Sequence, residues 1–169
     1  MYDSIFNFLN RFFKKATLFK IMFNISPMYR RTCGKITFVS SDLHVVKIKI
    51  PLTYKNKNYV GSMFGGSLFS ATDPIYMIQL MQILGKEYVV WDKSTEIKFK
   101  RPAYKNAFAT FEFSTKEIAT IIANVDEKKE IDMVKKLYIT DGKETVFTEL
   151  DKTIYISTKE NYKAKRAKN

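Results

Sequence analysis

Cysteine and histidine are almost absent from this chain of 169 residues, which contains one of each, Cys33 and His44. A single cysteine excludes an internal disulfide bond, and one Cys with one His is too few for a Cys/His zinc site, so we expect no metal ion. The lack of disulfide bonds is typical of a reducing compartment, and we expect a cytoplasmic protein. No stretch approaches about 18 consecutive apolar residues, so we expect no membrane-spanning helix.

Acidic residues are also in short supply, and the excess of positive charge lies at the two ends of the chain. The formal net charge is +12, from 29 Lys and Arg against 17 Asp and Glu. Residues 1–31 hold six basic residues against one acid, and residues 159–169 hold five against one, which leaves +3 for residues 32–158. We expect residues 159–169 to form a frayed, solubilising basic tail. Because no nucleic-acid reader motif accompanies the charge, we expect no nucleic-acid partner.

An amphipathic helix is predicted over residues 2–24, within an N-terminal extension that covers residues 1–31. Its apolar positions recur at steps of three or four and are Ile5, Leu9, Phe12, Ala16, Phe19 and Phe23. Such a helix either packs on the domain body or makes peripheral contact with a membrane, because basic residues accompany its phenylalanines. The sequence leaves both alternatives open.

Residues 32–158 predict a single α+β domain. A long apolar helix is expected over residues 67–84 with Gly85 as its C-cap, and a short surface helix over residues 115–130. Alternating apolar residues predict strands before and after the long helix, within residues 35–52, 89–102, 107–113, 131–140 and 144–157. We expect the four later strands to form an antiparallel meander, and the sheet to wrap around the long helix.

Glycine is scarce too, and three of the six glycines lie within residues 61–66. No P-loop or dinucleotide-binding pattern accompanies them. Gly65 and Gly66 stand instead at the entry to the long helix. Unpaired backbone N–H groups at a helix start stabilise developing negative charge, which is the physical basis of an oxyanion hole.

Asp73 follows Gly66 by seven residues, which is about two helical turns or roughly 10 Å. A carboxylate among apolar helix residues is costly unless it is used or paired. Pro74 disfavours helical geometry at Asp73, so we expect a kink there. Asp73 is therefore either a general base or nucleophile at a carbonyl, or a structural carboxylate that pairs with a lysine or caps a second helical segment.

The pattern formed by Asn58, Gly61, Phe64-Gly65-Gly66 and Asp73 resembles the signature of hotdog-fold acyl-CoA thioesterases of the phenylacetyl-CoA type. In that family the pattern reads Asn-x-x-Gly-x-x-His-Gly-Gly, followed by Asp seven residues after the second Gly. The segment STEIKFKRP, residues 94–102, resembles the strand that follows the hotdog helix. The similarity covers residues 34–156. Within the superfamily the chain resembles most an uncharacterised branch with an added N-terminal helix and a Trp-Asp-Lys element, here residues 91–93.

The resemblance implies an α+β hotdog fold and a thioesterase that hydrolyses acyl-CoA or an acyl carrier thioester. No separate cofactor is implied, because coenzyme A is part of the substrate. The Gly65 amide, with Gly66, would polarise the thioester carbonyl, and Asp73 would activate water or attack directly. Asn58 would support the loop or the site. The remaining candidates for substrate binding are Gly61, Asp92 and, for the phosphates of coenzyme A, Lys98, Lys100 and Arg101.

Phe64 stands where the family has histidine, and a phenylalanine side chain cannot donate a hydrogen bond. The alternative function is therefore a non-catalytic hotdog module that binds acyl-CoA or fatty acyl groups. A carbonyl that touches Gly65 cannot also reach Asp73, two turns away on a straight helix. We therefore expect a site shared between the subunits of a homodimer or homotetramer, as the resemblance also implies.

Overall fold

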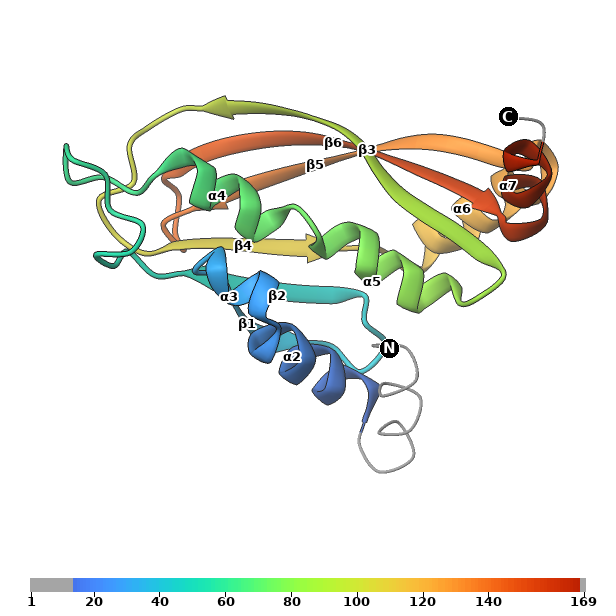
Figure 1. The fold of residues 1–169 in the computed structure, drawn as a ribbon, viewed down its shortest axis with the longest axis horizontal. Coiled ribbons are helices and arrows are strands. Elements are labelled where there is room, and N and C mark those ends of the chain that lie inside the picture. The colour runs from blue at the N-terminus through green and yellow to red at the C-terminus, as the bar shows by residue number, and fades with distance from the viewer. Residues whose placement is uncertain (1–13, 168–169) are drawn as a thin grey trace.

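The computed structural model describes residues 14–167, which contain six helices and six strands (Figure 1). The helices are α2 (Lys15–Ile25), α3 (Pro27–Arg31), α4 (Gly65–Thr72), α5 (Ile75–Leu84), α6 (Thr115–Lys128) and α7 (Lys159–Arg166). The strands are β1 (Lys35–Val39), β2 (Val45–Ile50), β3 (Tyr88–Phe99), β4 (Ala107–Glu112), β5 (Glu130–Thr140) and β6 (Val146–Thr158). None of the helices within residues 14–167 is long and apolar enough to cross a membrane.

The six strands form one antiparallel sheet in the order β1-β2-β4-β5-β6-β3, and α4 and α5 run along its length (Figure 1). The expected meander is wrong for β3, which pairs with β6 and not with its successor β4. After β3 the chain crosses the sheet to β4, which lies between β2 and β5. Strand β3 therefore lies at one edge of the sheet.

The core lies between the sheet and the two central helices. Residues Leu68, Ala71, Ile75 and Leu80 of α4 and α5 are buried, as are Leu150, Ile154 and Ile156 of β6. Alternation along β6 follows from the strand period of two, which turns every second side chain towards the helices. Burial of each such aliphatic side chain stabilises the fold by about 1.5–3 kcal/mol.

The long helix expected over residues 67–84 is divided at Asp73 and Pro74, as the predicted kink required. Pro74 has no N–H and its ring excludes a continuous helical path, so α4 ends at Thr72 and α5 begins at Ile75. Gly85 ends α5 with a φ of 85°, which confirms its predicted place as the C-cap.

The described part of the N-terminal extension packs on the domain body. Leu18, Phe19 and Phe23 of α2 are buried, and the Asn24 side chain bonds to both the N–H and the C=O of Ile36 in β1, each at 2.9 Å. Of the two alternatives for the predicted helix, packing on the domain therefore holds for α2. Residues 2–13 of that helix lie outside the described residues, and a membrane contact there stays a prediction.

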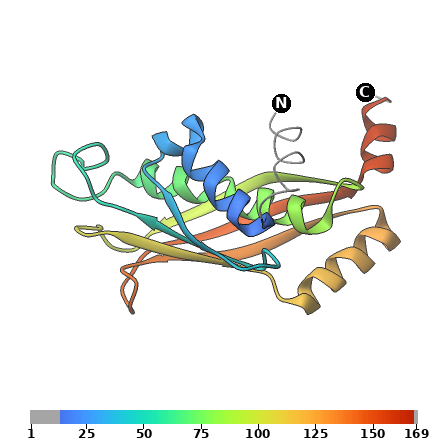
Figure 2. The ribbon, with the colours of Figure 1, turned by 90° about the horizontal axis from the view of Figure 1, so that it is seen from below.

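The C-terminal basic segment is a helix and not the frayed tail that we expected, at least as far as Arg166. The Thr158 hydroxyl accepts a hydrogen bond from the Asn161 N–H and caps the helix, and Lys165 pairs with Glu130 at 2.7 Å. Basic residues in its last turn also favour the helix dipole. Figure 2 shows α6 and α7 at the same end of the sheet, where β5 begins and β6 ends.

Candidate functional site

The loop before α4 is held in place by two asparagine side chains. Asn56 is buried, accepts a hydrogen bond from Thr53 N at 2.8 Å and donates one to Pro51 O at 2.9 Å. The side-chain oxygen of Asn58, Oδ1, accepts hydrogen bonds from the N–H groups of Val60 and Ser62, each at 3.1 Å. Asn58 thus supports the loop and does not reach the start of the helix through any described hydrogen bond.

Gly61 closes the turn that Asn58 organises. Its φ of 85° is a conformation that residues with a side chain rarely adopt, and its N–H donates to Asn58 O at 2.9 Å. The structure places Gly61 in this turn, so its backbone conformation explains the choice of glycine there.

Helix α4 begins directly after Phe64, whose extended backbone has a φ of −62° and a ψ of 127°. Among residues 14–167, neither Gly65 N–H nor Gly66 N–H has a protein acceptor. Two aromatic rings flank the pair: a Cβ at Gly65 would lie 2.8 Å from the ring of Phe99, and one at Gly66 would collide with the ring of Phe64. The two glycines therefore present bare backbone donors between phenylalanine rings.

A hollow of about 430 Å³ adjoins the start of α4 and brings Gly65 together with the end of β3. Its lining is mostly apolar, with two basic residues at one side: Met63, Gly65, Leu68, Phe99, Lys100, Arg101, Pro102 and Ala103. Lys98 does not line it and pairs with Glu96 at 2.9 Å. Of the three cations expected to bind phosphate, the structure therefore brings two to the helix start.

At the other end of α4, Asp73 meets a lysine that the sequence did not single out. The Lys152 ammonium lies 3.2 Å from Asp73 Oδ1 and 3.3 Å from Asp92 Oδ2, and also donates to the main-chain oxygen of Asp73. The Lys152 side chain is 0% exposed, that of Asp92 19% and that of Asp73 48%. Asp73 is therefore paired with a lysine, which was one of its two alternatives, and it also remains open to solvent.

The Asp92 side chain is less exposed to solvent than that of Asp73. Its Oδ1 is buried and has no hydrogen-bond partner among the described residues. Burial raises the pKa of Asp92, and the Lys152 ammonium beside it opposes that rise. The signal for Lys152 was present in the alternation of β6, because a lysine between Leu150 and Ile154 on the inward face needs a buried acid.

The sequence-predicted residues thus form two groups at opposite ends of α4. Gly65 lies with Lys100 and Arg101, whereas Asp73 lies with Asp92. At 1.5 Å per residue the two ends are roughly 10 Å apart, so one small reacting group cannot touch both within one chain.

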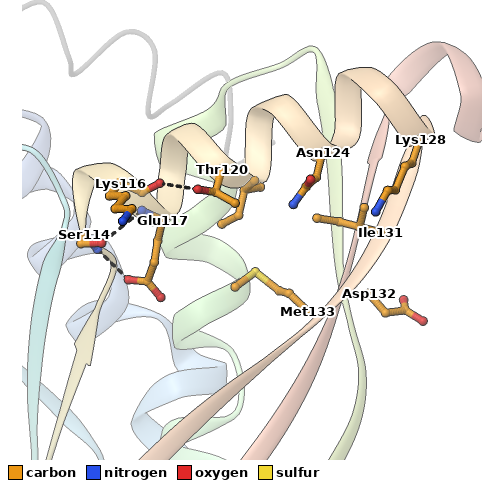
Figure 3. A pocket seen from close by; sticks show the side chains of 10 residues that line it. Ser114, Lys116, Glu117, Thr120, Asn124, Lys128, Ile131, Asp132 and Met133 are labelled. Atoms are coloured by element: carbon orange, nitrogen blue, oxygen red, sulfur yellow. Dashed lines mark hydrogen bonds between the residues drawn. The ribbon is translucent and has the colours of Figure 1, made fainter.

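A second hollow, of about 410 Å³, lies between α6 and the start of β5 and contains none of the predicted site residues (Figure 3). Ser114 and Glu117 form a reciprocal cap at the start of α6, which the dashed lines in Figure 3 mark in part. Glu117 also accepts a hydrogen bond from Lys135 at 2.7 Å. The polar groups on this side of the hollow are therefore already paired within the fold.

An antiparallel sheet wrapped along one central helix is the hotdog architecture, so the expected fold class is confirmed. The family model for a domain of unknown function (DUF4442) matches residues 15–156, and the chain therefore belongs to that family. Membership agrees with the uncharacterised hotdog branch that the sequence resembled. No curated protein shows significant similarity to the chain.

Solved structures share the fold at low sequence identity. A Pseudomonas aeruginosa protein described as a "Probable Thioesterase" is 17% identical with a TM-score of 0.74, over 84% of this chain and 95% of that one. A Chlorobaculum tepidum protein of unknown function is 14% identical with a TM-score of 0.66, over 92% and 96%. A Haemophilus influenzae thioesterase is 10% identical with a TM-score of 0.59, over 83% and 88%.

Proposed function

We propose that the protein is a thioesterase that hydrolyses acyl-CoA or an acyl carrier thioester. The observation that carries this proposal is the start of α4, where the amides of Gly65 and Gly66 have no protein acceptor among residues 14–167 and Gly65 lines a largely apolar hollow. The names of structural neighbours from Pseudomonas and Haemophilus support the same reaction class.

The chemistry needs a polarised carbonyl and an activated water. In the proposal, the thioester oxygen accepts hydrogen bonds from Gly65 and Gly66, which stabilise the tetrahedral oxyanion. Asp73 takes one proton from water as the water oxygen bonds to the carbonyl carbon. The C–S bond then breaks, and the thiolate receives that proton. The products are a carboxylic acid and a thiol, so the reaction needs no further co-reactant.

The separation of Gly65 from Asp73 favours a site built from two subunits. Strand β3 is 12 residues long and lies at the sheet edge, and its outer side has no partner among residues 14–167. Trp91 on this strand is 51% exposed. Long exposed edges favour pairing with another strand. We propose a homodimer, or a homotetramer of two such dimers, in which Gly65 of one subunit and Asp73 of the other face one substrate.

In the proposal, Lys100 and Arg101 bind a phosphate of the carrier. Both line the hollow beside Gly65, and the Lys100 ammonium also forms an ion pair with Glu149 Oε2 at 3.4 Å. An arginine can form two parallel hydrogen bonds to one phosphate group. Coenzyme A and the phosphopantetheine arm of an acyl carrier both supply such a group.

Phe64 supports a second candidate, the non-catalytic module that binds acyl-CoA or fatty acyl groups. Its ring is 59% exposed and lies beside Gly66, where the related thioesterases carry a hydrogen-bonding imidazole. Without that imidazole, the site offers only backbone donors to the thioester.

Thiol release from a panel of acyl-CoAs, short to long and aromatic, separates the two candidates. We expect turnover by the wild type and its loss in Asp73→Asn, with turnover retained in Asp126→Asn, a change of an exposed aspartate on α6. No turnover on any substrate, together with intact acyl-CoA binding, would leave the non-catalytic module as the function.

A further inference from the structure

We propose that Lys152 is a positioning residue that fixes Asp73 by one carboxylate oxygen, leaves the other free to accept a proton, and is itself balanced by Asp92. This inference rests on the proposed function, because it assigns Asp73 the part of general base. It adds to that function a buried cation that touches no substrate.

The hydrogen-bonding capacity of Lys152 matches its surroundings. An ammonium group has three protons. Three oxygens lie around Nζ: the main-chain oxygen of Asp73, Asp73 Oδ1 at 3.2 Å and Asp92 Oδ2 at 3.3 Å. No proton of Lys152 is left for a substrate, so its influence on the reaction passes through Asp73.

The contacts hold both the backbone and the side chain of Asp73. This residue stands at the break between α4 and α5, where carbonyl groups lack their usual helical partners. One ammonium that binds its main-chain oxygen and Oδ1 fixes the direction of the carboxylate. No residue in 14–167 bonds to Asp73 Oδ2, and the side chain is 48% exposed. The free oxygen is therefore the one that can meet water.

The position of Lys152 is not explained by stability. Its neighbours two residues away on the inward face of β6, Leu150 and Ile154, are aliphatic and buried. A lysine at such a place must be desolvated, and well-packed hydrophobic residues in place of a buried ion pair are often as stable or more so. A buried cation between two acids at a helix break is instead typical of a group that tunes a functional carboxylate.

The other charged groups near Lys152 pair with one another, so Lys152 interacts with the two aspartates. Lys135 of β5 lies opposite Lys152 in the sheet, but its ammonium goes to Glu117 and lies 4.8 Å from the centre of the Phe113 ring. Figure 3 shows Glu117 at the start of α6. Tyr76 of α5 stays neutral, because burial raises its pKa. Among the described residues, the charged groups in this cluster are thus Asp73, Lys152 from β6 and Asp92 from β3.

Lys152 and Asp92 carry opposite charges, so their removal should change the titration of Asp73 in opposite directions. A nearby cation favours the ionised form of a carboxylate and a nearby anion disfavours it. Lys152→Met removes the cation and leaves Asp92, so Asp73 should titrate at higher pH. Asp92→Asn leaves the cation to Asp73 alone, so Asp73 should titrate at lower pH.

The first measurement is a pH titration of the Asp73 ¹³Cγ signal by NMR, with Asp73→Asn to assign the signal. The second is the acid limb of the profile of kcat against pH. We expect the two readouts to move together, up in Lys152→Met and down in Asp92→Asn, and kcat of Lys152→Met to fall by about a hundredfold through lost orientation. Lys135→Met, which alters a partly buried lysine that pairs with Glu117 and has no described contact to Asp73, should shift the signal much less.

The double variant Lys152→Met/Asp92→Asn separates positioning from support of the fold. It leaves no uncompensated buried charge, so it should fold even where Lys152→Met alone does not. Folded protein with kcat still reduced about a hundredfold supports the inference, because the anchor of Asp73 is gone. Wild-type kcat in this variant, or unchanged titration of Asp73 in both single variants, would overturn it. If the wild type shows no turnover, the proposed function fails and the titration alone decides the inference.

Discussion

The N–H of Gly65 can be removed by the substitution Gly65→Pro. Gly65 is the first residue of α4, a position where proline is well tolerated because its missing N–H has no helical partner. The preceding residue, Phe64, already has the extended ψ of 127° that a following proline requires. The variant should therefore fold, while the proposed oxyanion hole loses one of its two donors.

The expected loss follows from the value of a single such donor. Removal of one oxyanion-hole hydrogen bond lowers kcat by about 10²–10³, or about 2.7–4 kcal/mol of transition-state stabilisation. Substrate binding should change little, since the donor acts mainly on the charge that develops during the reaction. The assay is thiol release at saturating acyl-CoA, with circular dichroism and thermal unfolding to check the fold.

Gly65→Ala is the matched control. Any Cβ at this position would lie 2.8 Å from the exposed ring of Phe99, so both variants must displace that ring, but only proline removes the N–H. We expect alanine to retain most of kcat and proline to lose it. Equal kcat in the two folded variants would refute the assignment of the Gly65 amide to the reacting carbonyl.

Three further predictions test the assembly, the carrier and the fold. Mixed dimers of an Asp73→Asn chain and a Gly65→Pro chain should regain up to about half of the wild-type activity, because one of their two shared sites is intact, and verified mixed dimers without activity would contradict shared sites. Lys100→Ala with Arg101→Ala should raise KM about tenfold or more for acyl-CoA but not for an acyl-pantetheine that lacks phosphate, and equal effects on both would exclude a phosphate contact. Asn24→Ala should lower the free energy of unfolding by about 1–3 kcal/mol in urea titrations, since it leaves two backbone groups of β1 unpaired, whereas an unchanged midpoint would mean that water replaces both bonds.

Local chemistry made several features predictable from the sequence. The kink at Pro74 follows from a missing N–H and a ring clash, and the end of α5 at Gly85 follows from a φ that favours glycine. Such rules depend on a few neighbouring residues, and they need no knowledge of the rest of the fold.

Features that join distant segments were not predictable in the same way. The place of β3 beside β6 depends on which faces must be buried together, and chain order suggested a meander instead. The helix α7 depends on Glu130, which lies far from Lys165 in the sequence. Lys152 could be recognised as an inward lysine, but its partners come from two other elements, and only the fold brings Asp73 and Asp92 to it.

The Asn24 side chain has a consequence for how many copies of this chain can join. It occupies the outer hydrogen-bonding groups of Ile36 much as a neighbouring strand would, and Lys20 takes up the next carbonyl, that of Thr37. Within residues 14–167, side chains thus occupy outer groups of β1 at Ile36 and Thr37, whereas the outer side of β3 has no partner strand. A sheet with only one open edge strand can pair with one other sheet through its edges. In the proposed dimer, two copies that meet through β3 would therefore leave only their β1 edges exposed, and pairing through β3 would stop at two copies.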